Sequence, residues 1–236
     1  TANGSRLFEE ASRVEAATEG VRTAIGETSS GVVRISTSEG FGTAIIAPAV
    51  PQLVAKRPKL QLEIVAMPGF LSSAMREVDI AITLGRPEDA RLEIEKLTDY
   101  TLGLYATRGY LEKNGRPSTV VELRRHSLIG YIDDLLYANE LRYLDDVLPG
   151  LKPIISSSSI RAQQEMIARD VGLGILPCSM GETAPELVRL LPKEIAITGT
   201  FWLSARRDVL QTARARHVRN WVYEAVAARR RILLPN

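Results

Sequence analysis

The sequence contains a single cysteine, Cys178, among its 236 residues. An internal disulfide is therefore excluded, and so is a zinc site built from several thiolates. We expect Cys178 to be a packed small side chain, with a redox-reactive thiol as the alternative. Histidine is almost as scarce. His126 follows two arginines and His217 lies in an arginine-rich stretch, so both are expected to be surface or capping residues.

Other signatures of catalysis and of membrane insertion are missing as well. The sequence offers no nucleophile paired with a base, no metal-ligand spacing and no phosphate-binding glycine loop, so we expect no enzyme, no cofactor and no metal. No apolar run approaches the roughly 18 residues that span a bilayer. The polar start TANGSRLFEEASR lacks the apolar body of a secretory signal. We therefore expect a cytoplasmic protein that has no membrane contact.

Charge of one sign is not in excess, because the net charge is only +2. That value is too small to indicate nucleic-acid binding by this chain itself. With 45% hydrophobic and 25% charged residues, the chain can bury one large or two medium cores. The arginine-rich end, residues 206–231, predicts a solvated helix face rather than a surface that contacts phosphates. Trp202 and Trp221 are expected in the core.

The first thirty residues carry a heptad stripe that ends at Gly26. The pattern predicts an amphipathic helix, which either packs on its own domain or serves as a linker and dimerisation helix. The turn-rich joint 27–31 that follows favours the second interpretation. The apolar positions of the stripe are Leu7, Ala11, Val14, Thr18, Val21 and Ile25.

From Gly31 onwards, strand and helix patterns alternate. Two βαβ steps precede residue 85, which predicts right-handed crossovers, a largely parallel sheet and a ligand at the carboxyl ends of its strands. A capping box at Thr119–Glu122 is expected to open one helix, and two prolines to distort another. The expected strands are 32–37, 60–67, 79–84, 102–106, 127–132, 152–157, 174–176, 187–190 and 199–204. The expected helices follow residue 42 and cover 71–77, 107–113, 119–125, 135–147, 160–171 and 209–230.

The stretch SSIRAQQEMIARDVGLGILP, residues 158–177, is the most informative of these segments. Ser158 or Ser159 can cap a helix, Gly172 stands where a left-handed residue would end it, and a short strand runs into Pro177. A helix placed this closely between two strands is an αβ unit of a wound sheet. Its serine-capped end is a natural place to hold a small anion.

Taken in order, four segments resemble the effector-binding region of LysR-type transcriptional regulators. They are VRISTSEGFGTAIIAPAVPQLVAKRPKLQLEIV, DIAITLGRP, SSSIRAQQEMIARDVGLGILP and FWLSARRDVLQTARARHVRNWV. Val171, Gly174, Ile175 and Pro177 hold places related to the late V-x-x-G-x-G-I-x-x-L-P pattern of that family. The start TANGSRLFEEASRV is similar to the beginning of its linker helix.

This resemblance implies an α/β fold with two αβ lobes of periplasmic-binding-protein type II architecture. The expected division is a linker helix at 1–30, lobe I at 31–101 and 205–236, and lobe II at 102–204. The winged helix-turn-helix of the family would precede residue 1, so this chain would sense a small organic effector, as a homodimer or higher oligomer, without itself binding DNA. A free-standing solute-binding protein of a transport system is the alternative. The heptad helix and the polar start favour the regulator.

The effector is expected where strand ends from both lobes meet. Hydroxyls and free amides there suit a carboxylate, whereas Glu39 and Asp133 favour an amine, an amino acid or a neutral aromatic compound. The alternative for the serines is that they only cap helices, and Tyr131 can equally be a core residue. The predicted cleft residues are Thr37, Ser38, Glu39, Met67, Pro68, Tyr131, Ile132, Asp133, Ser158, Ser159 and Pro177.

Overall fold

The computed structural model describes residue 14, residues 31–66 and residues 78–235. Val14 is helical and its side chain is exposed. The other five residues of the heptad stripe lie outside the described residues, as do the expected helix 71–77 and the predicted cleft residues Met67 and Pro68.

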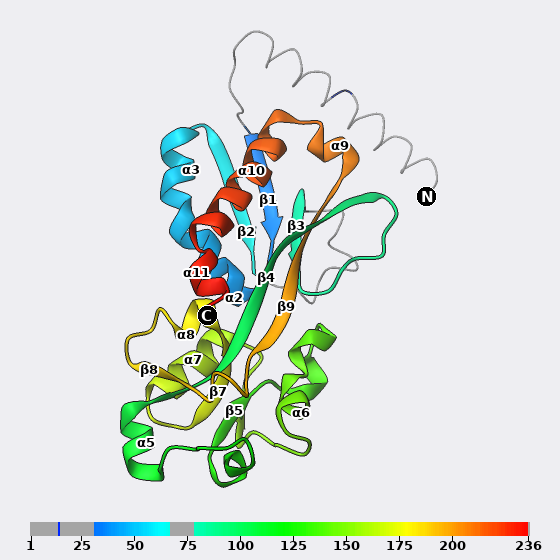
Figure 1. Cartoon of the computed structure of the whole chain (residues 1–236). Helices are drawn as coiled ribbons and strands as arrows, with labels where there is room; N and C mark the ends of the chain where they lie inside the picture. The colour runs from blue at the N-terminus through cyan, green and yellow to red at the C-terminus, as the bar shows by residue number, and fades with distance from the viewer. Residues whose placement is uncertain (1–13, 15–30, 67–77, 236) are drawn as a thin grey trace.

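Two lobes are visible in Figure 1, and the first contains a small parallel sheet. Strand β1 (Gly31–Ser36) pairs in parallel with both β2 (Leu60–Val65) and β3 (Ile80–Thr83). All three strands were expected. In β1, the β-branched side chains of Val33 and Ile35 are fully buried on one face of the strand. Lobe I here denotes the part of the chain that carries these strands.

The helical segment after β1 changes its hydrogen-bond pattern several times. Pro48 lies in its 3-10 turn and Pro51 at the start of its last helix, and neither proline can donate a backbone hydrogen bond. The expected distortion of this helix is therefore confirmed. The segment consists of α2 (Glu39–Phe41), the π-helical η1 (Gly42–Ile46), the 3-10 helix η2 (Ala47–Ala49) and α3 (Val50–Lys56).

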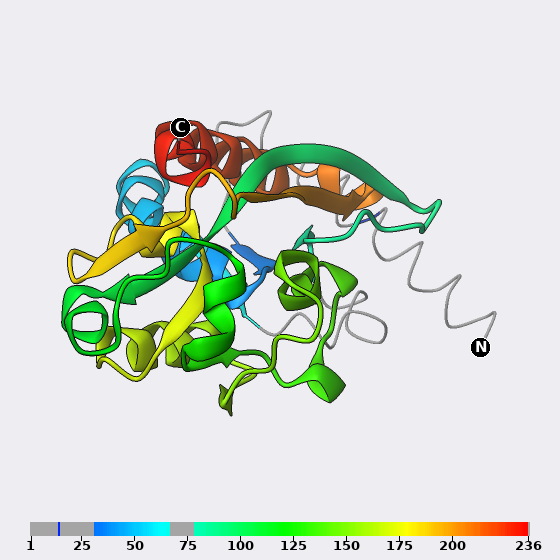
Figure 2. The ribbon, with the colours of Figure 1, turned by 60° about the horizontal axis from the view of Figure 1, so that its bottom comes forward.

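Two long strands connect the lobes. Strands β4 (Leu92–Thr107) and β9 (Ile197–Arg206) pair antiparallel from Leu92↔Arg206 to Leu102↔Ile197, with a register shift between Lys96 and Thr98. Figures 1 and 2 show them running side by side as one curved ribbon from lobe to lobe. The expected strand at 102–106 was ten residues too short at its start, because the first half of β4 is half exposed and alternates charged with apolar side chains.

The second lobe continues the same sheet. Strands β5 (Leu128–Gly130), β6 (Ile155–Ser156) and β7 (Leu173–Pro177) are parallel, whereas β7 and β8 (Leu187–Leu190) pair antiparallel with β4. The described strands form one sheet in the order β2-β1-β3-β9-β4-β7-β5-β6, with β8 beside β4. The expected parallel pairing is thus confirmed within each lobe and wrong around β4 and β9.

The helices of lobe II and of the chain end differ more from expectation. Instead of one helix at 135–147, the chain makes three short turns, because Ala138 adopts an extended backbone between them. The long terminal helix is divided at Thr212, whose side chain caps its second part. The remaining elements are α5 (Arg108–Asn114), η4 (Val121–Arg125), η5 (Asp133–Leu135), η6 (Asn139–Leu141), α6 (Tyr143–Val147), α7 (Ile160–Ala168), α8 (Cys178–Gly181), α9 (Arg207–Leu210), α10 (Ala213–Ala228) and α11 (Arg230–Leu233).

Two local predictions about helix ends were wrong. No capping box forms at Thr119, because Ser118 donates both its amide and its hydroxyl to the Glu122 carboxylate and the segment becomes a 3-10 helix. Asp170, not Gly172, takes the left-handed conformation after α7, with φ of 60°. The Thr107 hydroxyl and Lys113 bind the Asp170 carboxylate and hold it there.

The main core runs through both lobes, and Trp221 is buried in it as expected. Trp202 was expected there too, but it is only half-buried and the Arg86 guanidinium lies 5.5 Å from the centre of its ring. The arginine-rich end was expected to be a solvated helix face. Arg219 in this stretch is instead partly buried and forms an ion pair with Glu95. None of the helices in the described part of the chain combines the length and apolar character needed to cross a bilayer.

Gly172 has a packing role, which gives a stability prediction. A Cβ at this residue would overlap the carbonyl oxygen of Ser127, which accepts the hydrogen bond from Leu173 that starts β7. We expect Gly172→Ala to lower the free energy of unfolding by about 1–3 kcal/mol in urea titrations. Gly42→Ala is the control, because its Cβ would meet only a methyl group of Thr37 at 3.1 Å. Equal stability of both variants would contradict this account of the β7 junction.

Candidate functional site

A cavity of about 260 Å³ lies between the two lobes. Lobe I contributes the start of α2 and the residues after β2 and β3. Lobe II contributes the start of α7, the end of β7, Ser179 of α8 and the 131–143 segment, and β4 and β9 supply the rest. The lining residues are Ser38, Glu39, Gly40, Phe41, Ala66, Leu84, Tyr100, Leu102, Tyr131, Tyr137, Leu141, Tyr143, Ser158, Ser159, Ile160, Ile175, Pro177, Ser179 and Phe201.

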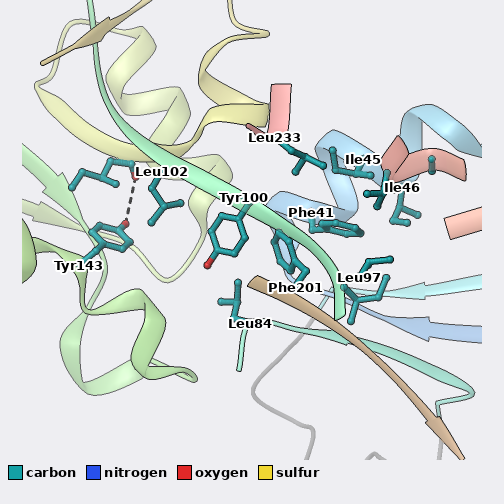
Figure 3. Packing of buried hydrophobic residues seen from close by; sticks show 14 of the residues in the cluster. Phe41, Ile45, Ile46, Leu84, Leu97, Tyr100, Leu102, Tyr143, Phe201 and Leu233 are labelled. Carbon is teal, nitrogen blue, oxygen red and sulfur yellow. Dashed lines mark hydrogen bonds between the residues drawn. The ribbon is translucent and has the colours of Figure 1, made fainter. Parts of the chain in front are cut away.

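The connecting strands supply an aromatic stack to this cavity. The ring of Phe201 on β9 lies 4.4 Å from that of Tyr100 on β4 and 4.5 Å from that of Phe41 on α2. All three side chains are buried, and such tilted ring pairs add stability beyond the area they bury. Figure 3 shows the hydroxyl oxygen of Tyr100 pointing away from Phe41 and Phe201.

Lobe II adds three further tyrosines to the cavity wall. Tyr131 and Tyr143 meet edge to face with ring centres 6.1 Å apart. The Tyr143 hydroxyl donates to the carbonyl of Ile175 at 3.4 Å, and a dashed line from Tyr143 in Figure 3 marks this bond. Burial raises the pKa of both phenols. Burial, with the carboxylates of Glu39 and Glu140 nearby, raises the pKa of Tyr137 to about 12. These phenols therefore stay neutral near pH 7, where each can donate and accept a hydrogen bond.

Three of the tyrosine hydroxyls have no assigned hydrogen bond. Within the described part of the chain, no protein atom forms one with the hydroxyl of Tyr100, Tyr131 or Tyr137. None of the three hydroxyls is among the fully buried unpaired polar atoms of the described residues, and Tyr137 is 37% exposed, so these phenols are available to a ligand or to water.

A hydrogen bond between two residues that line the cavity joins the two lobes. Ser159 is the N-cap of α7, where its Oγ accepts from the amide of Ala162 at 3.1 Å, and the same hydroxyl donates to Oε1 of Glu39 on α2 at 3.0 Å. Gly40 permits this close approach, because a Cβ there would lie 3.1 Å from Sδ of Met180. The end of α7 that suited an anion therefore already faces a carboxylate of the protein.

The described part of the cavity lining carries negative charge and no positive charge. Among the described residues that line it, Glu39 is the only one with an ionisable acid or base other than tyrosine. Glu140 lies just beyond, against Gly85. The Arg86 guanidinium next to Gly85 is placed over Trp202. The described surroundings are thus acidic and aromatic.

The structure brings together six of the predicted cleft residues. Ile132 and Asp133 instead line a second cavity of about 360 Å³ within lobe II. Thr37 lies at the end of β1 with 1% exposure, and its Oγ1 has no hydrogen-bond partner among the described residues. That any of them binds a ligand stays a prediction. The six that line the inter-lobe cavity are Ser38, Glu39, Tyr131, Ser158, Ser159 and Pro177.

Sequence reasoning missed most of the aromatic wall. Tyr100 stands in the part of β4 before residue 102, where no strand was expected, and Tyr137 and Tyr143 stand where one continuous helix was expected. The signal that could have found them is the tyrosine content of the 131–143 segment, which holds three of the seven tyrosines in the sequence.

The cysteine and the two histidines do not line the inter-lobe cavity. Cys178 is buried at the start of α8, and burial raises the pKa of its thiol, which disfavours the reactive thiolate. His126 lies 3.3 Å from the Tyr110 hydroxyl and His217 lies 3.3 Å from the Arg57 guanidinium. Burial lowers the pKa of both imidazoles. In the described ranges no three His, Cys, Asp or Glu side chains gather as metal ligands would.

Known proteins resemble this chain over most of its length. Residues 26–227 match the family model described as LysR substrate binding domain. The HTH-type transcriptional regulator CrgA of Neisseria meningitidis serogroup C (strain 8013) is 29% identical over 136 residues, which cover 56% of this chain and 46% of CrgA. The Mau operon transcriptional activator of Paracoccus denitrificans is 22% identical over 82% of this chain and 65% of the activator. The chain spans about half the length of the first of these curated relatives.

Solved structures show the same fold. The regulatory domain of CrgA from Neisseria meningitidis superposes with a TM-score of 0.74 at 21% identity, over 83% of this chain and 98% of that domain. The effector domain of the transcriptional regulator AmpR of Pseudomonas aeruginosa gives a TM-score of 0.66 at 18% identity, over 85% of this chain and 98% of that domain. At these identities the likeness establishes the two-lobed α/β fold.

The double role of Ser159 gives a prediction about stability. We expect Ser159→Ala to lower the free energy of unfolding by about 1–2 kcal/mol, because the cap of α7 and the hydrogen bond to Glu39 are lost together. Ser158→Ala is the matched control, since Ser158 is exposed and lines the same cavity. Chemical denaturation of the ligand-free protein measures both values. Equal stability of the two variants would show that the hydrogen bonds of the Ser159 hydroxyl do not stabilise the fold.

Proposed function

Because this chain belongs to the LysR substrate-binding domain family and folds as a two-lobed effector-binding domain of periplasmic-binding-protein type II architecture, we propose that a small organic molecule binds between its lobes and controls transcription through a DNA-binding domain. The observation that carries the proposal is the cavity lined from both lobes, with an acidic side chain and with tyrosine hydroxyls that have no hydrogen-bond partner among the described residues. A molecule held there contacts both halves of the protein at once.

Closure of the lobes is the mechanism that this geometry supports. The lobes are joined through β4 and β9, and across the cavity they meet at the Ser159–Glu39 hydrogen bond. A ligand that touches both walls stabilises the closed arrangement only by the difference between its affinities for the closed and open forms. Side chains that change their contacts on closure then carry the signal to other parts of the regulator.

The remaining partners follow from the family. We infer a winged helix-turn-helix outside the present residues as the part that contacts DNA, and a homodimer or higher oligomer as the assembly, with 1–30 as the linker helix. The division into lobe I (31–101 and 205–236) and lobe II (102–204) belongs to the same proposal, as does a cytoplasmic location without membrane contact. The matched relatives are transcriptional regulators, which favours this role over solute transport.

A catalytic role has less support. Histidine and cysteine are both absent from the described lining of the cavity, and Ser38 and Ser159 use their hydroxyls as helix caps. The only ionisable partner of the Ser159 hydroxyl in the described lining is the weakly basic Glu39 carboxylate, so the site is better suited to binding than to covalent chemistry. We therefore assign the cavity to sensing.

A cavity-filling variant tests the proposed site. Leu141 lines the cavity and is half-buried, so Leu141→Trp should occupy part of its volume. Compounds that raise the melting temperature of the unchanged protein are first selected from small acids, amines and neutral aromatic compounds. We expect Leu141→Trp to weaken their binding in calorimetric titrations by about tenfold or more, which corresponds to about 1.4 kcal/mol.

Leu135→Trp is the control for this experiment. Leu135 is 61% exposed, belongs to the neighbouring 3-10 helix and does not line the cavity. Its substitution should leave affinity unchanged. Should Leu141→Trp fold and still bind the selected compounds with full affinity, the inter-lobe cavity is not the sensing site.

A further inference from the structure

The described lining of the inter-lobe cavity disfavours the binding of an anion. The α7 end, whose free amides would attract a carboxylate, faces the Glu39 carboxylate, which accepts the Ser159 hydroxyl at 3.0 Å. No lysine or arginine lines the described part of the cavity to offset that charge. A ligand carboxylate placed beside Glu39 would add a second negative charge in surroundings that are poorer in water than the protein surface. An anionic effector is therefore disfavoured.

The aromatic wall points to the opposite charge. Aromatic rings from four segments surround the cavity, and a ring face attracts cations. Tyr100 and Tyr143 are almost fully buried, so a cation beside them would be largely removed from water, where this attraction is strongest. A carboxylate close to tyrosine faces is a combination that recognises ammonium groups.

The hydroxyls add direction to this recognition. Tyr100, Tyr131 and Tyr137 have no protein partner for their hydroxyls in the described part of the chain, so these oxygens can accept the hydrogen atoms of an ammonium group. Glu39 also has a carboxylate oxygen, Oε2, that takes no part in the bond to Ser159. Tyrosine oxygens and Glu39 Oε2 together are acceptors, which suits a ligand rich in donors.

The size of the cavity limits the rest of the molecule. An apolar cavity of about 150 Å³ is large enough for benzene. The volume of about 260 Å³ found here therefore accommodates one ring with a short side chain. The apolar lining by Phe41, Leu84 and Phe201 suits the ring, and the carboxylate of Glu39 lines the same cavity.

From these contacts we propose that the effector is a small organic amine, with one aromatic or apolar ring among the cavity's rings and its ammonium group bound to the carboxylate of Glu39 and the hydroxyls of Tyr131 and Tyr137. This proposal rests on the proposed function, because it names the ligand class of the same cavity. It does not depend on which promoters are regulated.

Matched probes test the ligand class directly. Phenethylamine, phenethyl alcohol and phenylpropanoate share one ring and differ in charge, and the same three end groups on para-hydroxyphenyl and cyclohexyl rings complete the panel. Calorimetric titration of the whole chain measures each affinity. We expect the amines to bind about tenfold or more tightly than the alcohols, and the acids to bind weakest of all.

Variants identify the group that selects the charge. Glu39→Gln keeps the acceptor oxygen for Ser159 but removes the charge, so amine affinity should fall about tenfold while alcohol affinity stays the same. Glu112→Gln is the control, since Glu112 is an exposed glutamate of α5 outside the cavity. Urea titrations verify that each variant is folded. If Glu39→Gln unfolds, Glu39→Asp, which keeps the charge and shortens the side chain, must retain the preference for amines over alcohols.

The outcomes separate the two proposals. Tighter binding of acids or alcohols than of amines, abolished by Leu141→Trp, overturns the amine assignment and leaves the sensing cavity standing. Amine binding that Glu39→Gln does not change also overturns the assignment. Absence of binding by every probe at millimolar concentration, together with no hit in the broader compound screen, overturns the sensing cavity and the ligand class together.

Discussion

The antiparallel pairing of β4 with β9 is the constraint on which the rest of the structure depends. The two strands stay hydrogen-bonded from Leu92↔Arg206 to Leu102↔Ile197, and each passes from one lobe to the other. The lobes therefore share one sheet, and their relative angle can change only by bending this ribbon. Tyr100 and Phe201 belong to the ribbon itself, so the part of the protein that bends also forms a wall of the cavity.

Local sequence patterns were sufficient for β1 and for the start of α7. The β-branched run at 32–37 gave β1, and the hydroxyl of Ser159 caps α7 as expected, because both depend on neighbouring residues. The first half of β4 was missed for the opposite reason. Glu93, Glu95 and Lys96 make it look like a loop, and only pairing with β9, about a hundred residues further along the chain, makes it a strand.

The candidate site was predictable in position but not in chemistry. Strand ends and helix starts identified Ser38, Glu39 and Ser159, since topology brings the ends of parallel strands to one edge of a sheet. The hydrogen bond from Ser159 to Glu39 spans 120 positions of the sequence, and no local pattern contains it. Read alone, the serine-capped helix indicates an anion site. With Glu39 beside it, the same helix end has its charge already balanced by the protein.

The Ser159 hydroxyl has a consequence for how binding is coupled to lobe position. One oxygen accepts from the α7 backbone and donates to Glu39, so the cap of a lobe II helix and the contact between lobes are the same group. Any molecule that binds Glu39 either keeps this hydrogen bond and adds to it, or replaces it. In the first case the closed form gains all of the new contacts, and in the second it gains only the difference. If the proposed amine binds Glu39, the residue that recognises the charge of the effector also shifts the balance between open and closed lobes.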